Sequence, residues 1–251
     1  MNISEIYNFI DNIAPFDTQC DWDNSGLLIG SRDSVIHKIG FALDADNNAV
    51  EQAHASGCDL IVTHHPIIFN PVSNIEFNTP IEKALKYGIA IISAHTNYDK
   101  SDKGVNYCLA ELTKLTDISA LETDGKESMC MYGCTTISDP DKFATFLSRV
   151  FSRPITYTNG KRTIFKVAVC GGAGGEFIGN CYNAGMDAFI TGEVKHHEYL
   201  EAARLGISVF CCGHYETENP AIIRLANITG RELNIETVLL NQTNFIKHTG
   251  V

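Results

Sequence analysis

The segment KIGFALDADNNAVEQAHASGCDLIVT, residues 38–63, aligns without a gap with KVAVCGGAGGEFIGNCYNAGMDAFIT, residues 166–191. The offset is 128 residues throughout, so that Gly57 aligns with Gly185. Each copy consists of an apolar strand-like run, a helical stretch, a glycine where the helix ends, and a second apolar run. Any two βαβ units share this order, so the alignment alone leaves open whether the copies are related.

Both copies also lead to the same pair of chemical groups. The first leads to His95 and Asp99 in AHTNYD, and the second leads to His214 and Glu218 in GHYETE. The order of strands and helices does not require a histidine followed by a carboxylate at this spacing. The shared ending therefore favours an internal repeat.

The rest of the chain continues the alternation of apolar strand-like runs and helical stretches. Strands are predicted at 35–43, 59–63, 89–94, 128–137, 164–170, 187–191, 207–212 and 234–240, and helices at 2–13, 46–56, 79–87, 104–114, 139–151, 175–184, 196–204 and 219–228. Asn159-Gly160 predicts a hairpin turn. We predict an α/β fold of two similar intertwined repeats with mixed sheets, with lobes near 1–125 and 126–251 and the metal site in the cleft between them. No Pro/Gly/Ser-rich linker separates the lobes, which favours interleaving.

Composition limits the location and the partners of the chain. Its 251 residues are 44% hydrophobic, which is enough for one large domain or two small ones. The formal net charge is −11 and there is no cluster of Lys and Arg, so we expect neither an extended nucleic-acid footprint nor membrane binding. The start of the sequence lacks a basic signal-peptide region, and the nine cysteines lie mostly in apolar contexts typical of reduced thiols. We therefore expect a cytoplasmic protein.

Three segments place metal-binding side chains just after a predicted buried strand. The first is DLIVTHHPIIF, residues 59–69, in which His64 and His65 follow the apolar run and Pro66 restricts His65 to extended geometry. The other two are the histidine–carboxylate endings of the repeats. Each pattern is common by itself, but their recurrence at equivalent strand ends predicts a metal site. The predicted ligands are His64, His65, Asp99, His214 and Glu218.

Five ligands are too many for one open catalytic zinc ion. They suit two ions that share a carboxylate and lie about 3.5–4 Å apart. Imidazole and carboxylate together accept zinc, iron, manganese, nickel or cobalt, so the residues predict two divalent ions of open identity. His95 is left as a candidate for supporting the ligands.

Three further segments have two interpretations each. In TGEVKHHEYLEA, Glu193 and His196 are candidate catalytic residues that transfer protons, or candidates for orienting ligand imidazoles, or ordinary residues of a helix N-terminus. GGAGGEF, residues 171–177, predicts either a phosphate cradle or a tight glycine turn. In CDWDNSGLLIG, we expect Trp22 to pack at a lobe edge and Asp23 to form a turn; spacing alone does not support an active-site role for Asp23.

Taken together, WDNSGLLIG, LIVTHHPIIF, AHTNYD, TGEVKHH and GHYETE resemble the GTP cyclohydrolase 1 type 2 homologue family over nearly the whole chain. The resemblance implies two intertwined α/β repeats, a two-metal site between them and a homohexameric ring. It places the metal ligands at the same five residues. The interval from about 115 to 165 is too short for the extra domain of longer members, so the resemblance is to the compact form.

These observations leave two classes of function. The first is a metal-dependent hydrolase acting on a small molecule with a metal-activated water. It could be a GTP cyclohydrolase, as the resemblance implies, in which Glu193 or His196 moves protons while the guanine ring opens at C8, or a phosphoesterase or amidohydrolase. The second is a non-enzymatic metal-binding, interaction or regulatory protein. Metal identity and substrate are open in both classes.

Overall fold

The computed structural model describes residues 1–123, 126–242 and 244–246, and the chain forms two compact units. The first unit contains Met1–Ser101 and Ala221–Thr243, and the second contains Asp102–Pro220 together with the chain from Asn244 on. The chain therefore leaves the first unit after Ser101 and returns to it at Ala221. This division differs from the expected lobe boundary at residues 125 and 126, because the strands on either side of that point pair with each other in the second unit.

The first unit is built on a five-stranded mixed sheet with the order β1-β4-β3-β2-β11. Only β1 runs antiparallel to its neighbour, so β2, β3 and β4 end at the same edge of the sheet. The strands are β1 (Gly26–Ile29), β2 (Lys38–Ala42), β3 (Leu60–Thr63), β4 (Ala90–Ser93) and β11 (Glu236–Leu239).

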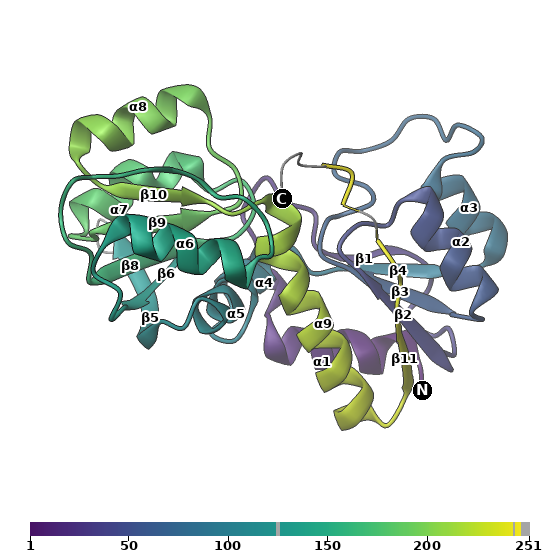
Figure 1. Cartoon of the computed structure of the whole chain (residues 1–251). Coiled ribbons are helices and arrows are strands. Elements are labelled where there is room, and N and C mark those ends of the chain that lie inside the picture. Colours follow the sequence, from purple (N-terminus) through teal and green to yellow (C-terminus); the bar gives the residue numbers. More distant parts are fainter. Residues whose placement is uncertain (124–125, 243, 247–251) are drawn as a thin grey trace. The chain divides into compact units, whose positions relative to one another are not determined.

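Helices cover both faces of this sheet (Figure 1). On one face, α2 (Asn47–Ala55) and α3 (Pro80–Tyr87) pack on an apolar cluster that includes Ala53, Ile61 and Ile91. On the other face lies α1 (Ile3–Ile13), whose Ile3, Ile6 and Ile10 are completely buried. The spacing of these isoleucines places them on one side of the helix, which explains why it docks as an amphipathic element.

The second unit is built on a six-stranded mixed sheet with the order β5-β6-β8-β9-β10-β7. Alternate residues of β8 enter separate cores: Val167 and Val169 pack with α5 (Val105–Leu112) and α6 (Pro140–Val150), whereas Ala168 and Cys170 pack with α7 (Ile178–Asn183) and α8 (His196–Leu205). This alternation follows from the two-residue period of a strand that is covered on both faces. The strands are β5 (Thr116–Thr123), β6 (Lys126–Cys134), β7 (Thr156–Thr158), β8 (Lys166–Cys170), β9 (Ala188–Thr191) and β10 (Ser208–Cys211).

The repeat seen in the sequence is present in the pairing of the strands. In the first unit, β2 and β3 pair in parallel from Ile39 with Leu60 to Ala42 with Thr63. In the second unit, β8 and β9 pair from residue 167 with 188 to residue 170 with 191, which is the same register shifted by 128 residues. The two sheets are thus built around the same βαβ unit.

Two helix boundaries bear on the site. A five-residue helix, α4 (Thr96–Lys100), follows β4 directly, and the long helix α9 (His214–Leu233) begins five residues before the expected start at residue 219. Both His–carboxylate pairs therefore lie at the start of a helix rather than in an extended strand end. Residues four apart on a helix share one face, which decides how these side chains are presented.

The hairpin predicted at Asn159-Gly160 is wrong. The chain does turn there, but β7 pairs antiparallel with β10, and β8 lies between β6 and β9. Gly160 packs closely against the connection between α8 and β10, so that a Cβ at Gly160 would lie 2.4 Å from the carbonyl oxygen of Gly206. The N–H of Gly160 donates to Ser208 Oγ. Tertiary contacts thus outweigh the local turn preference. Across the described residues, no helix is both long and apolar enough to span a membrane.

Candidate metal centre

His64 and His65 lie where β3 ends, in a turn that backbone hydrogen bonds close. The N–H groups of both donate to the carbonyl oxygen of Leu43, over 3.2 Å and 3.0 Å. Thr63 Oγ1 donates to the carbonyl oxygen of His65 over 2.9 Å, and Pro66 follows directly. Since β2 and β3 are parallel neighbours, both imidazoles lie at the edge of the sheet where α/β proteins commonly bind ligands.

One ring nitrogen of each histidine is held by an oxygen acceptor. His64 Nδ1 donates to the carbonyl oxygen of Ala94 over 2.9 Å, and His65 Nδ1 donates to Oδ1 of Asp44 over 2.7 Å. Because a carbonyl and an ionised carboxylate only accept, these contacts assign the proton to Nδ1 and the lone pair to Nε2. Metal-binding histidines in proteins are oriented in this way.

His95 has the same arrangement. Its Nδ1 lies 2.8 Å from Oδ1 of Asp23, and the Asp23 carboxylate also accepts hydrogen bonds from the Thr96 N–H (3.0 Å) and Ser25 Oγ (2.9 Å). The Asp23 side chain is fully buried. Burial by itself would raise the pKa of Asp23, but the hydrogen bonds from His95 and Thr96 outweigh it and hold the pKa below its usual range. Asp23 therefore stays ionised and fixes the orientation of His95.

The donor atoms of the first unit converge. One ring nitrogen each from His64, His65 and His95 lie within 4.8 Å of one another. Asp99 on α4 adds a carboxylate, with Oδ1 at 3.6 Å from His64 Nε2, and its side chain is largely buried. The first unit therefore collects three imidazoles and one carboxylate at one edge of its sheet.

The second unit presents a smaller set of the same chemistry. His214 and Glu218 lie one turn apart at the start of α9, and His214 Nε2 is 3.0 Å from Oε2 of the buried Glu218. On its other side, His214 Nδ1 lies 2.8 Å from Oε1 of Glu193. His214 is thus held at Nδ1 by a carboxylate and directs Nε2 toward a second one, as a ligand histidine does.

Gly172 makes room for this pair. A Cβ at this position would lie 2.1 Å from Oε1 of Glu218 and 3.2 Å from Nε2 of His214. The residue also has a φ of +62°, in the left-handed region that favours glycine. Both the space and the backbone conformation therefore require glycine beside these donor atoms.

The glycine-rich turn is a structural support rather than a phosphate cradle. The N–H of Gly171 donates to Asn106, the N–H of Gly172 to Thr217, and the N–H of Gly174 to Thr191. Side chains already satisfy these three amides, so they are not available to hold a phosphate. The tight-turn interpretation is the one that the geometry supports.

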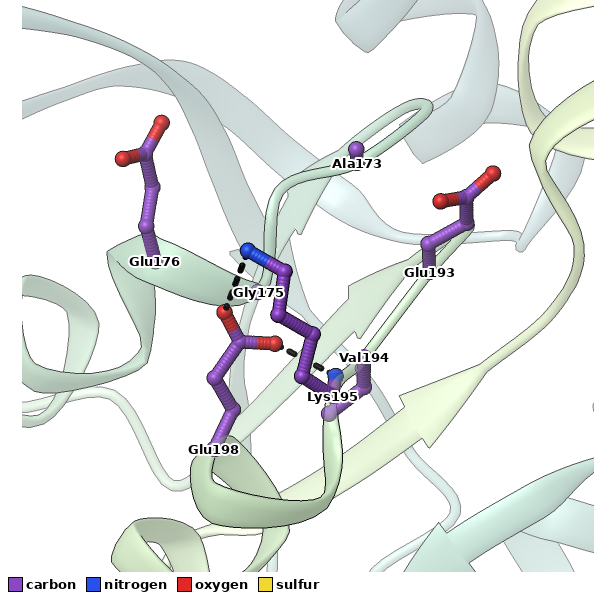
Figure 2. Close-up of a pocket in the computed structure, with 7 residues that line it drawn as sticks. All are labelled: Ala173, Gly175, Glu176, Glu193, Val194, Lys195 and Glu198. Atoms are coloured by element: carbon purple, nitrogen blue, oxygen red, sulfur yellow. Dashed lines mark hydrogen bonds and ion pairs between the residues drawn. The ribbon is translucent and has the colours of Figure 1, made fainter.

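A pocket next to this turn is acidic. Figure 2 shows Lys195 reaching toward Glu198, with the Glu176 and Glu193 carboxylates at the rim. The backbone N–H of Lys195 donates to Oε2 of Glu198 over 2.6 Å. The side-chain ammonium of Lys195 lies 4.0 Å from Oε1 of the same carboxylate. With three carboxylates to one ammonium, the pocket disfavours anions. Its lining residues are Ala173, Gly175, Glu176, Glu193, Val194, Lys195 and Glu198.

The residues present fit divalent metal ions. Four imidazoles are held at Nδ1 by oxygen acceptors, so that each would offer Nε2 as a neutral nitrogen ligand. Asp99 and Glu218 add carboxylate oxygens next to His64 and His214, respectively. This set of nitrogen and oxygen donors suits zinc and the other first-row divalent ions.

The structure brings His64, His65 and Asp99 together in the first unit, and His214 and Glu218 together in the second. Of the two candidate catalytic residues, Glu193 contacts His214, whereas His196 begins α8 with an exposed side chain.

Of the three acids that hold histidines, Glu193 was expected as a candidate for orienting a ligand imidazole, whereas Asp44 and Asp23 were not assigned to the site. Asp44 comes two residues after β2 ends, and a carboxylate at a strand end was a usable signal. Asp23 lies 72 residues from His95, so no local pattern linked the two. Trp22, which was expected to pack at a lobe edge, is 58% exposed, and its ring lies against those of Phe69 and His95.

Fold and donor residues define a two-unit α/β protein with histidine–carboxylate sites of the kind that bind divalent metals. Residues 1–245 match the family model Duf34/NIF3 (NGG1p interacting factor 3). The chain belongs to this family, which confirms the resemblance drawn from its motifs.

Relatives with the name GTP cyclohydrolase 1 type 2 homolog cover most of the chain. The protein from Campylobacter jejuni is 34% identical over 87% of this chain and 88% of its own length. The protein from Methanocaldococcus jannaschii is 31% identical over 96% of this chain and 100% of its own.

Solved structures share the fold. A hypothetical protein from Staphylococcus aureus matches with a TM-score of 0.89 at 24% identity, over 99% of both chains. Reduced HcgD from Methanocaldococcus jannaschii matches with a TM-score of 0.85 at 28% identity, over 96% of this chain and 98% of its own. The α/β class with two mixed sheets, predicted from the sequence, is confirmed.

Proposed function

We propose that this chain is a dinuclear divalent-metal protein that hydrolyses a small molecule with a metal-activated water. The observation that carries the proposal is the common orientation of His64, His65, His95 and His214, each held at Nδ1 by an oxygen acceptor. Four such histidines in two sequence-distant sets are more than a structural role requires. Exposed or core histidines need no carboxylate that fixes one tautomer.

The two donor sets complement each other chemically. One provides three imidazoles and Asp99, and the other provides His214 and Glu218. We propose that both sets serve one dinuclear centre, with His64, His65, Asp99, His214 and Glu218 as ligands. Two divalent ions of zinc, iron, manganese, nickel or cobalt would supply a water of lowered pKa and polarise the bond under attack.

The residues around the ligands have roles of their own in this proposal. Asp44 holds His65 in the tautomer that leaves Nε2 for a metal, and Asp23 fixes His95 in the same tautomer beside the proposed ligands. Glu193 does the same for His214, and about half of its side chain is exposed, so it could also accept a proton from a bound reactant. His196 is the second candidate for proton transfer, through an exposed imidazole at the start of α8.

Several features follow from the family rather than from the site. The names of the relatives suggest GTP cyclohydrolysis, in which water adds at C8 of guanine and the imidazole ring opens. We propose a small-molecule substrate, with a nucleotide as the first to test, a homohexameric assembly, no membrane or extended nucleic-acid partner, and a cytoplasmic location. All nine cysteines lie in the described part of the chain and none of them forms a disulfide bond there, which suits a reducing compartment.

A non-enzymatic role is the second candidate. The family description itself names an interacting factor. In this case the two donor sets would bind metal to control the contacts of the protein with a partner. The discriminating outcome is a fully metal-loaded protein that turns over none of the tested substrates but loses a partner when a ligand is removed.

One experiment tests both candidates. Purified chain is loaded with each divalent metal in turn, its metal content is measured, and it is incubated with GTP and with panels of phosphoesters and amides. Turnover that His64→Ala abolishes and His37→Ala preserves would support the hydrolase. His37 is the matched control because it is exposed and precedes β2, at the opposite end of the strand from the site. Fewer than two bound ions per chain with every metal tested would contradict the dinuclear centre.

A further inference from the structure

Two exposed aromatic rings lie beside one of the histidines of the first unit. Trp22 is 58% exposed and Phe69 is 43% exposed, and their ring centroids are 5.9 Å apart with an angle of 37° between the planes. Each also meets His95 nearly edge-on, with centroid distances of 6.0 Å for Trp22 and 6.3 Å for Phe69. The pair therefore forms an aromatic surface that borders the histidine cluster.

The backbone on both sides of this surface is fixed. Asp23, the residue after Trp22, holds His95 and Thr96. Asn24 donates through Nδ2 to the carbonyl oxygen of Ile68, the residue before Phe69, over 2.7 Å. Two segments that are distant in sequence are thus tied together immediately next to the two rings. This arrangement preorganises the aromatic surface, which lowers the entropy lost when a ligand binds there.

Exposure alone would not make these rings a binding surface. Phe77, in the segment after Phe69, is 88% exposed, and Phe165 is 59% exposed. Trp22 and Phe69 differ from them because their rings contact each other and His95. Two aromatic rings exposed side by side form a small apolar patch, which argues for a use of the exposed position.

We propose that Trp22 and Phe69 bind a planar heteroaromatic ring of the ligand, such as a nucleobase, and hold it beside the histidine cluster. The proposal rests on the metal centre proposed above and names the class of its substrate. A flat ring can stack on the indole while its edge meets the phenyl ring, because aromatic pairs favour offset and edge-to-face geometry. Stacking of a base on an aromatic side chain tolerates different bases, so the surface defines a class of ligand and not one nucleotide.

Trp22 is the only tryptophan of the chain, so its fluorescence reports on this surface directly. The full-length protein is titrated with guanosine, with GTP, and with inorganic triphosphate and ribose 5-phosphate as ligands without an aromatic ring. Free N-acetyltryptophanamide corrects for absorption by the nucleobase. We expect saturable quenching by guanosine and GTP and none by the ring-free ligands. Phe69→Ala should weaken the guanosine affinity by about fivefold or more, whereas Phe77→Ala should leave it unchanged.

A second arm separates this inference from the metal centre. Cobalt(II) bound at the histidine cluster should quench Trp22, whereas zinc should not, because open-shell ions quench nearby indoles. Cobalt quenching without any response to guanosine or GTP would overturn the aromatic surface and leave the metal centre standing. Emission that changes on simple dilution of the protein would also overturn it, by showing that a second copy of the chain covers Trp22. No cobalt quenching, together with no bound metal, would count against the centre itself.

Discussion

Glu193 occupies in the second repeat the position that His65 occupies in the first. The His65 N–H donates to the carbonyl oxygen of Leu43 over 3.0 Å, and the Glu193 N–H donates to that of Gly172 over 2.9 Å. At the same turn, one repeat therefore carries an imidazole and the other a carboxylate. The imidazole has its own carboxylate partner in Asp44, whereas the carboxylate is itself the partner of His214. Both repeats thus have this turn, but the first places a predicted metal ligand there and the second places a carboxylate that holds a predicted ligand.

Replacing Glu193 should weaken metal binding without unfolding the protein. Glu193→Gln removes the charged acceptor at His214 Nδ1, and losing such a partner commonly costs about 10- to 100-fold in metal affinity. Competition with a chelating dye measures the change. Glu176→Gln, at the rim of the same pocket and also exposed, is the control and should bind metal as the unmodified chain does. Equal affinities for both variants would remove Glu193 from the site.

The repeat predicts equal roles for two aspartates. Asp59 accepts hydrogen bonds from the backbone N–H groups of residues 37 and 38, and Asp187 accepts them from those of residues 165 and 166. Replacing either with Ala should lower the free energy of unfolding by roughly 1–3 kcal/mol, because two backbone donors lose their acceptor. Calorimetry compares both variants with Asp33→Ala, an exposed control. A loss at one aspartate and none at the other would contradict equivalent roles.

The sequence predicted the strands that belong to the repeat, and it missed the strands whose position depends on tertiary contacts. The register of β2 with β3 and of β8 with β9 follows from one alignment, because apolar runs of equal length lie at the same spacing in both copies. The edge strand β1 pairs antiparallel with β4 and its buried residues do not alternate along the strand, so no two-residue period marks it. Short edge strands are decided by the neighbour that they pair with, and the three-residue β7 is the clearest case.

The residues of the candidate site also differ in how far the sequence could predict them. The five predicted ligands could be read from local motifs, because each follows a buried run directly. Oδ1 of Asp99 lies 3.6 Å from Nε2 of His64, 35 residues earlier in the chain, and Asp23 reaches His95 from 72 residues away. A carboxylate that orients a ligand from a distant segment leaves no spacing to detect. Local motifs therefore indicate candidate ligands more readily than the distant residues that would hold them.

A buried thiol should make the protein lose stability at alkaline pH. Burial raises the pKa of Cys58 from 9.0 to about 11, although the Lys38 ammonium partly opposes it. Because the folded pKa is the higher one, the stabilisation is complete below pH 9.0 and is lost as pH rises through about 11. Cys58→Ala should remove this loss, which amounts to at most about 3 kcal/mol at 1.4 kcal/mol per pKa unit. Urea unfolding near neutral and alkaline pH measures it.

The same pair of measurements on Cys134→Ala provides the control, since Cys134 is only partly buried. That variant should keep the alkaline loss of the unmodified chain. A Cys58→Ala protein whose unfolding free energy falls with pH as steeply as that of the unmodified chain would show that other groups cause the loss.

The glycine beside Glu218 allows the sharpest test of the second donor set. Gly172→Ala adds a methyl group 2.1 Å from Oε1 of Glu218, so the carboxylate cannot keep its present position beside His214. Gly185→Ala is the matched control, because Gly185 also has a positive φ, of 78°, but a Cβ there would meet nothing within 4 Å. Both variants should lose about 1–2 kcal/mol of stability from the left-handed backbone. Only Gly172→Ala should also lower the affinity for added metal, as measured by calorimetric titration. Unchanged affinity in a folded Gly172→Ala protein would mean that Glu218 does not bind the metal.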